Sequence, residues 1–301
     1  ANFDQSIAPF ATAKIDVSSV LPDVAWPQQI EVRAGKYFAR PRYEIFGPAD
    51  RHRISHINVE RTDLKVDPSI PELSKHIGKG HLLPAPILPM DRWRSIALPT
   101  PMATCQTELP LALIIYDASG HEIAREALGR LSRDHRRVID VTAFAADWGG
   151  LPSGYGHFEL VYDFSDGGGA DGWLHALFRY EDNESGHGAD TSFGAHVFNT
   201  VLTYKGEPQS YIAEPPGLTT RLFLRLGQLP LDTMCHLIYP ASTPWHERSS
   251  TECVLFDGTG TEINHWTGEI PCGGSHLWRY RNVFSDAVSY THLTLPTILL
   301  V

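Results

Sequence analysis

The sequence predicts an all-β protein made of two tandem antiparallel β-sandwich modules with Ig-like, Greek-key connections. Three observations predict this fold class. Short apolar runs bounded by turn residues recur along the 301 residues, no segment sustains the 3.6-residue period of an amphipathic helix, and one phrase occurs twice. A chain of this length also exceeds the usual size of a single domain.

The repeated phrase is "LIIYDASGHEI" at 113–123 and "CVLFDGTGTEI" at 253–263, an offset of 140 residues. Four positions are identical in the two copies: Asp117 and Asp257, Gly120 and Gly260, Glu122 and Glu262, and Ile123 and Ile263. Solenoid repeats have periods of about 20–50 residues, so this longer period indicates an internal duplication of one module.

The repeated phrase itself predicts a turn. An apolar run ends at Asp, whose side chain can accept a hydrogen bond from its own backbone two residues on. Gly then supplies the positive φ that closes a short hairpin with a bulge. We therefore expect the same hairpin in both copies, with a structural role and not a catalytic one.

The apolar runs predict the strands in chain order. The first copy has six runs: Tyr43–Phe46, Ile54–Val59, Ser95–Leu98, Leu111–Tyr116, Val138–Val141 and Phe158–Phe164. The second copy has six more: Trp173–Tyr180, Ser192–Leu202, Arg221–Leu226, Met234–Tyr239, Glu252–Phe256 and His276–Phe284. Short helical turns are expected at Ile70–Ile77, where Ser and Pro mark a start site, and near Thr142–Trp148.

The glycine-rich segment 166–172 predicts a linker or hairpin between a first module at 1–165 and a second module at 173–287. The first copy ends in a closing strand, "GYGHFELVYDF", that the second copy lacks, so we expect the second module to be truncated. The segment 288–301 matches nothing in the first copy. It is interpreted as a non-native tail, with a divergent last strand as the alternative.

Composition excludes some classes of partner. The formal net charge is −10 without a basic stripe, and an acidic chain repels phosphate backbones, so nucleic acid is not expected as a partner. No apolar run approaches the roughly 20 residues that span a bilayer. No targeting segment is visible, and the compartment and the oligomeric state stay open.

The chain has four cysteines: Cys105, Cys235, Cys253 and Cys272. They form neither a CxxC motif nor a zinc-like spacing with histidine. We expect free thiols that act as small core hydrophobes. The alternative concerns Cys235 and Cys253, which could face each other across a hairpin.

A candidate ligand site follows from strand direction. If successive strands of the second copy run up and down, loops 203–219, 240–249 and 265–275 emerge at the same end. These loops carry the expected contacts Tyr204, Tyr211, Trp245, His246 and Trp266. Aromatic rings beside polar groups suit an amphipathic ligand such as a sugar ring. The sequence thus favours a non-catalytic binding or structural protein without a cofactor, with glycan or polysaccharide as ligand; the alternative for these rings is a cap on the sandwich.

Two further alternatives stay open. The 15 histidines are numerous, and His175, His187, Asp190 and His196 could form the centre of an enzyme that uses one divalent transition metal, if their side chains converge. The same histidines could instead be structural, because their spacing places them on different strands or loops and His196 lies 140 residues after His56, at the repeat offset. The sequence has no P-loop, nucleophile elbow or HExxH motif. The other alternative is an assembly module that pairs through its sheet edges.

Overall fold

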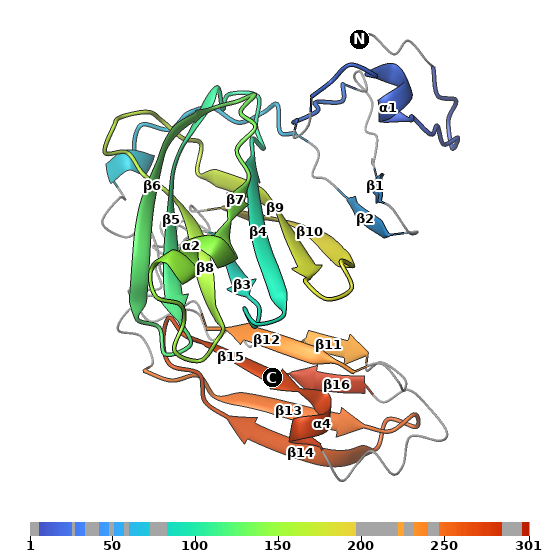
Figure 1. The fold of residues 1–301 in the computed structure, drawn as a ribbon, viewed down its shortest axis with the longest axis vertical. Coiled ribbons are helices and arrows are strands. Elements are labelled where there is room, and N and C mark those ends of the chain that lie inside the picture. The colour runs from blue at the N-terminus through green and yellow to red at the C-terminus, as the bar shows by residue number, and fades with distance from the viewer. Residues whose placement is uncertain are drawn as a thin grey trace.

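The computed structural model describes residues 6–25, 28–33, 42–47, 51–56, 60–72, 83–196, 222–225, 232–239, 247–284 and 297–300. For 83, 193–196, 222–225 and 297–300 it describes the backbone alone. The described chain is mostly β, and its strands form several antiparallel sheets (Figure 1).

Two four-stranded sheets dominate the described chain. The first has the order β3-β8-β5-β6, with β3 at Leu83–Ile87, β8 at Gly156–Tyr162, β5 at Glu108–Asp117 and β6 at Glu122–Ser132. The second has the order β10-β9-β4-β7, with β10 at Gly188–His196, β9 at Trp173–Asp182, β4 at Trp93–Thr100 and β7 at Ile139–Asp140. Helix α2, Val141–Asp147, follows β7, and the Asp140 carboxylate caps it by accepting a hydrogen bond from the Ala143 amide at 3.0 Å.

Side chains of both sheets share one hydrophobic core. Leu174, Ala176 and Phe178 alternate along β9 and are all buried, as period-two geometry requires of an inward face. They pack with buried residues of the first sheet, and the rings of Phe158 and Phe178 lie 5.6 Å apart, edge to face. The segment 166–172 therefore joins strands that share a core, and the predicted boundary there does not separate two cores.

The remaining strands form smaller sheets. Strands β12, Met234–Ile238, and β15, Ser275–Arg279, pair with each other. A four-stranded sheet has the order β11-β16-β13-β14, with β11 at Leu222–Arg225, β16 at Thr297–Leu300, β13 at Thr251–Phe256 and β14 at Glu262–Gly268. A second core contains Cys235, Cys253, Leu255, Trp278, Tyr280 and Phe284. Nearer the N-terminus are helix α1, Val17–Val20, and the hairpin of β1, Arg42–Phe46, with β2, His52–His56.

Most expected strands coincide with observed ones, and the exceptions have local causes. Strand β3 was not expected because it contains Pro84 and Pro86; it pairs with β8 alone, and an edge strand tolerates the missing amide hydrogens. The run at His276–Phe284 is a strand only to Arg279 and continues as helix α4, Tyr280–Val283. The helical turn expected near Thr142–Trp148 is confirmed as α2. Residues 297–300 of the suspected tail pair with β11 and β13, and 288–296 lie outside the described residues.

Both copies of the repeated phrase form the same hairpin with the same bulge. The Asp117 carboxylate accepts hydrogen bonds from the amides of Ser119 and His121, both at 2.9 Å. The Asp257 carboxylate accepts them from Thr259 and Thr261 at 2.8 and 2.9 Å. The register shifts at the last pair before each turn, and Gly120 and Gly260 have φ of 87° and 85°. The predicted turn is therefore confirmed at both positions.

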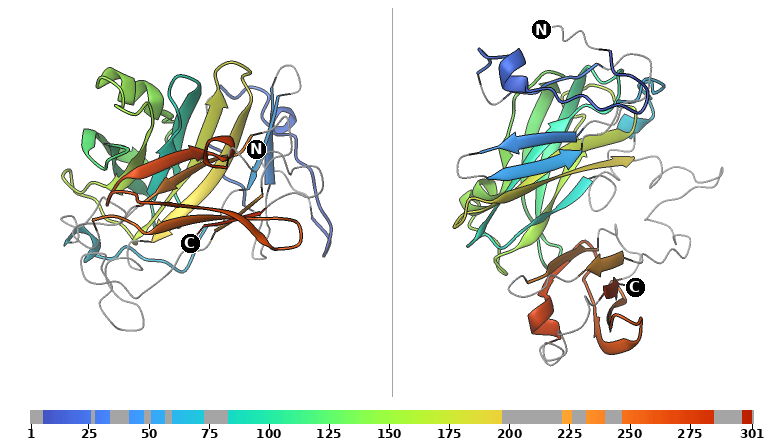
Figure 2. Two further views of the ribbon diagram at one scale, coloured as in Figure 1. Left: turned by 90° about the horizontal axis from the view of Figure 1, so that it is seen from below. Right: turned by 90° about the vertical axis from the view of Figure 1, so that its right-hand side faces the viewer.

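The described chain up to β10 is called the first half, and the described chain from β11 onward is called the second half. The first of the two turns contacts this second half. The amide of Ser275 donates a hydrogen bond to the Ala118 carbonyl at 3.0 Å, and a Cβ on Gly120 would lie 2.7 Å from the Cys272 carbonyl oxygen. Figure 1 and the right view of Figure 2 show the orange and red strands of the second half directly beneath the first-half sheets. The two halves therefore pack at the end of β5.

The buried His157 and the half-buried His236 lie at this contact. His157, which is 0% exposed, stacks on Tyr116 at 5.1 Å, and His236 meets Tyr155 edge to face at 5.5 Å. All four ring nitrogens are buried without a hydrogen-bond partner within the described part of the chain. Burial lowers the pKa of His157 to about 3; the imidazole of His236 acts in the same direction and the Asp117 carboxylate opposes it. Burial, with His276 nearby, lowers the pKa of His236 to about 4.

The two repeated glycines provide a matched test of the packing between halves. Alanine at either position strains a left-handed backbone, which costs about 1–2 kcal/mol. A Cβ added at Gly260 would meet open space, whereas at Gly120 it would collide with the backbone of Cys272 and Gly273. We expect Gly120→Ala to lower the free energy of unfolding by at least about 1 kcal/mol more than Gly260→Ala, measured by urea denaturation. Equal losses would show that this turn does not pack against the second half.

The histidine pair predicts an acid-sensitive fold. The unfolded chain binds more protons than the folded chain below the ordinary histidine pKa of 6.5, so stability is greatest above pH 6.5 and falls as the pH drops toward 4. Each group contributes a slope of up to about 1.4 kcal/mol per pH unit. We expect His157→Phe to flatten this fall in urea titrations between pH 6.5 and 4, and His187→Phe, at an exposed position, to leave it unchanged. If the free energy of unfolding fell equally with pH in both variants, His157 would not be a source of the acid sensitivity.

Candidate functional site

The structure describes one of the five expected ligand contacts. Tyr204, Tyr211, Trp245 and His246 lie outside the described residues. Trp266 lies within strand β14, opposite Cys253, and not on a loop as expected, because backbone pairing with β13 continues to Gly268. Its indole stacks on His276 at 5.5 Å and packs against the second core, and it lies so close to Gly268 that a Cβ there would collide with it. Trp266 therefore contributes to the packing of the second core.

The expectation that two of the loops share one end is confirmed for their described residues. The Ser249 amide donates to the Ile270 carbonyl at 2.9 Å, and the Ile270 amide donates to Ser249 Oγ at 2.9 Å. The Cys272 amide donates to the Glu247 carbonyl, also at 2.9 Å. Segments 247–250 and 269–272 therefore run side by side where β13 begins and β14 ends.

An open depression of about 360 Å³ lies at this end of the β13–β14 hairpin. Its walls are mainly polar, and the lining residues are Arg248, Ser249, Ser250, Thr251, Glu252, Thr267, Gly268 and Glu269. Arg248 and Glu269 form an ion pair at 3.7 Å with both side chains more than 60% exposed, so solvent screens it and both groups can turn toward a ligand. The volume lies near the lower end of the range of small-molecule sites.

The four residues of the alternative metal centre do not come together. His187 precedes β10 and His196 ends it, so nine residues of strand, about 30 Å, separate their backbones. Asp190 is held by Arg179 at 2.9 Å and by the Tyr43 hydroxyl at 3.1 Å. His175 is buried and hydrogen-bonded to Thr100. The distance between His187 and His196 along β10 is therefore too large for the four residues to share one ion. Among the described residues, no group of three or more metal-ligating side chains could hold a metal ion.

A second depression, of about 250 Å³, lies between the β1–β2 hairpin and β10. Arg42 and His56 are direct partners across the hairpin, and Ser192 Oγ lies 3.3 Å from His56 Nδ1. Asp190 also lines it, with its charge balanced by Arg179. Sequence reasoning missed this juxtaposition because 136 residues separate His56 from Ser192 and no local pattern links them.

Among the described residues, no helix is long and apolar enough to cross a membrane. No model of a known protein family matches the chain, and no curated protein matches it significantly. Roles for its residues therefore rest on the geometry described above.

Proposed function

We propose that this chain is a non-catalytic glycan-binding protein, and that the depression at the start of β13 and the end of β14 receives the ligand. One observation carries the proposal. The depression lies at the end of the second copy where the sequence, from the direction of successive strands, predicts that the ligand-binding loops emerge. Binding residues concentrate on loops that a rigid scaffold holds, and here backbone hydrogen bonds hold both loop segments.

The proposed architecture is a pair of β-sandwiches that arose by duplication. The core shared by the sheets containing β5 and β9 supports a sandwich in the first half. The matching hairpins at Asp117 and Asp257 support a common origin, because carboxylate contacts, glycine conformation and bulge all agree.

The lining of the depression suits sugar hydroxyls. Four hydroxyl side chains supply both donors and acceptors, while Arg248 supplies donors and Glu252 and Glu269 supply acceptors. Mixed donors and acceptors on one surface are what a polyhydroxylated ring requires. The net charge of −10 disfavours acidic polysaccharides, so neutral glycans are the proposed ligand class.

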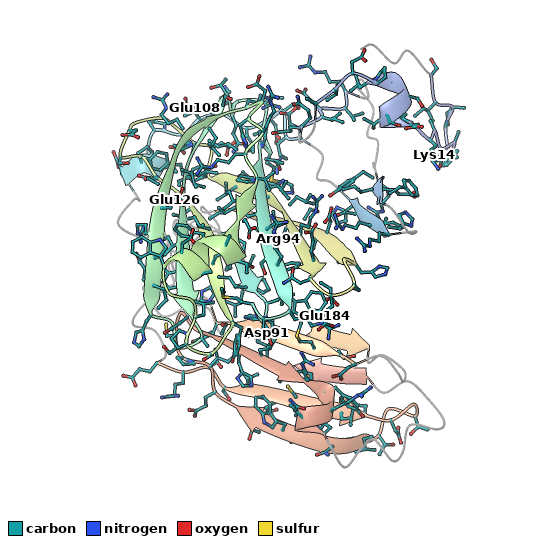
Figure 3. The ribbon with its side chains drawn as sticks, in the orientation of Figure 1. Lys14, Asp91, Arg94, Glu108, Glu126 and Glu184 are labelled. Atoms are coloured by element: carbon teal, nitrogen blue, oxygen red, sulfur yellow. The ribbon has the colours of Figure 1, made fainter. Side chains whose placement is uncertain are left out.

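The assembly alternative receives less support at the described edge strand β6. This strand carries a row of charged side chains, and Arg125 and Arg130 pair with Glu122 and Glu108, respectively. Figure 3 shows Glu108 and Glu126 at this side of the molecule. Charged edges oppose strand addition by another chain.

The test is binding of the full chain to a panel of neutral and acidic polysaccharides, followed by the double variant Arg248→Ala with Glu269→Ala. We expect the wild-type chain to bind a neutral member, and the variant to bind it at least about 10-fold more weakly, a change of roughly 1.4 kcal/mol. The melting temperature should stay unchanged, because an exposed ion pair contributes little to stability.

The matched control is Arg125→Ala with Glu122→Ala, which removes an exposed ion pair from the first half. It should leave binding unchanged. A folded wild-type chain that binds no member of the panel rejects glycan as the ligand class. Binding that survives in the Arg248 and Glu269 variant rejects this depression as the site.

A further inference from the structure

Two of the four thiols occupy the same small core. Cys235 is 8% exposed and Cys253 is 0% exposed, and both belong to the second core of six buried residues. Cys105 lies instead beside Asp171 in the first half, at 3.3 Å, and Cys272 lies in the loop after β14. Cys235 and Cys253 are therefore the two thiols that folding brings into one apolar compartment.

The strands that carry these two cysteines belong to different sheets. Cys235 lies on β12, directly opposite Trp278 of β15, and Cys253 lies on β13, directly opposite Trp266 of β14. Cross-strand partners project to the same face of a sheet, and all four side chains contribute to or pack against the second core. The two cysteine–tryptophan pairs thus point into the same core from two sheets.

Burial in this core keeps both thiols protonated. Burial raises the pKa of Cys253 to about 12, and the charge of Cys235 adds to the rise. Burial raises the pKa of Cys235 as well. Both groups are therefore protonated thiols in the folded, reduced chain, and they react slowly there because the thiolate is the nucleophile.

We propose that Cys235 and Cys253 are a covalent modification site that closes to an intramolecular disulfide between the two sheets when the chain folds in the presence of a disulfide oxidant. This inference is independent of the proposed ligand. The bond would join β12 to β13 through residues 18 positions apart and stabilise a core that has six buried residues within the described part of the chain.

Oxidised glutathione supplies the chemistry in two exchanges. The thiolate of one cysteine attacks the glutathione disulfide, forming a mixed disulfide and releasing one reduced glutathione. The second cysteine then attacks the protein sulfur of that mixed disulfide, which forms the protein disulfide and releases the second reduced glutathione. The two protein thiols are oxidised, glutathione disulfide is reduced, and the two thiol protons end on the released thiols. These steps require access, so they take place during folding.

The test refolds the full, reduced chain in a buffer of reduced and oxidised glutathione, quenches it with acid, and measures intact mass and a disulfide peptide map. We expect the loss of two hydrogen atoms and a peptide that joins Cys235 to Cys253. The cross-linked chain should melt at least about 5 °C above the chain refolded with a reductant alone.

The variant Cys105→Ser with Cys272→Ser should keep the mass change, and Cys253→Ala should lose it. The wild-type peptide map decides the matter even if Cys253→Ala does not fold. Four free thiols after refolding to the native far-UV spectrum, or a bond that includes Cys105 or Cys272, would overturn the proposal.

Discussion

The described structure depends on the complete burial of strand β5. From Leu109 to Asp117 all of its side chains are buried, although successive residues of a strand point to opposite faces. A strand buried on both faces must find backbone partners on both edges, because an unpaired buried amide or carbonyl is costly. Strands β6 and β8 provide them, and each pairs with β5 along most of its length.

The same strand connects the two halves of the chain. It ends at Asp117, and the hairpin that follows contacts the backbone at Cys272–Ser275. The equivalent hairpin at Asp257 has open space around its glycine. Identical local chemistry therefore serves a contact between halves in one copy and a solvent-exposed turn in the other. The difference arises from what each hairpin meets, since the hydrogen bonds within the two turns agree.

Part of the candidate site could be predicted from the sequence. Alternating strand direction correctly placed segments 247–250 and 269–272 together, because antiparallel pairing obliges alternate connections to emerge at one end. The same reasoning ended β14 too early and assigned Trp266 to a loop, since the polar residues Asn264, His265 and Thr267 interrupt its apolar pattern. The high number of histidines was a poor guide to a metal centre, because the extended strand β10 separates His187, which precedes it, from His196, which ends it.

The sequence by itself determined the β class, most strand positions and the repeated Asp–Gly turn, because these depend on side-chain alternation and on hydrogen bonds within five residues. Only the tertiary structure decided that strand β9 shares the core of the first half, that Cys235 and Cys253 occupy one core, and that the ring nitrogens of His157 and His236 are buried at the contact between halves. Each of these depends on which strands pair or which faces meet across long stretches of chain. Local patterns carry no information on such pairings, because any apolar face can be buried against several others.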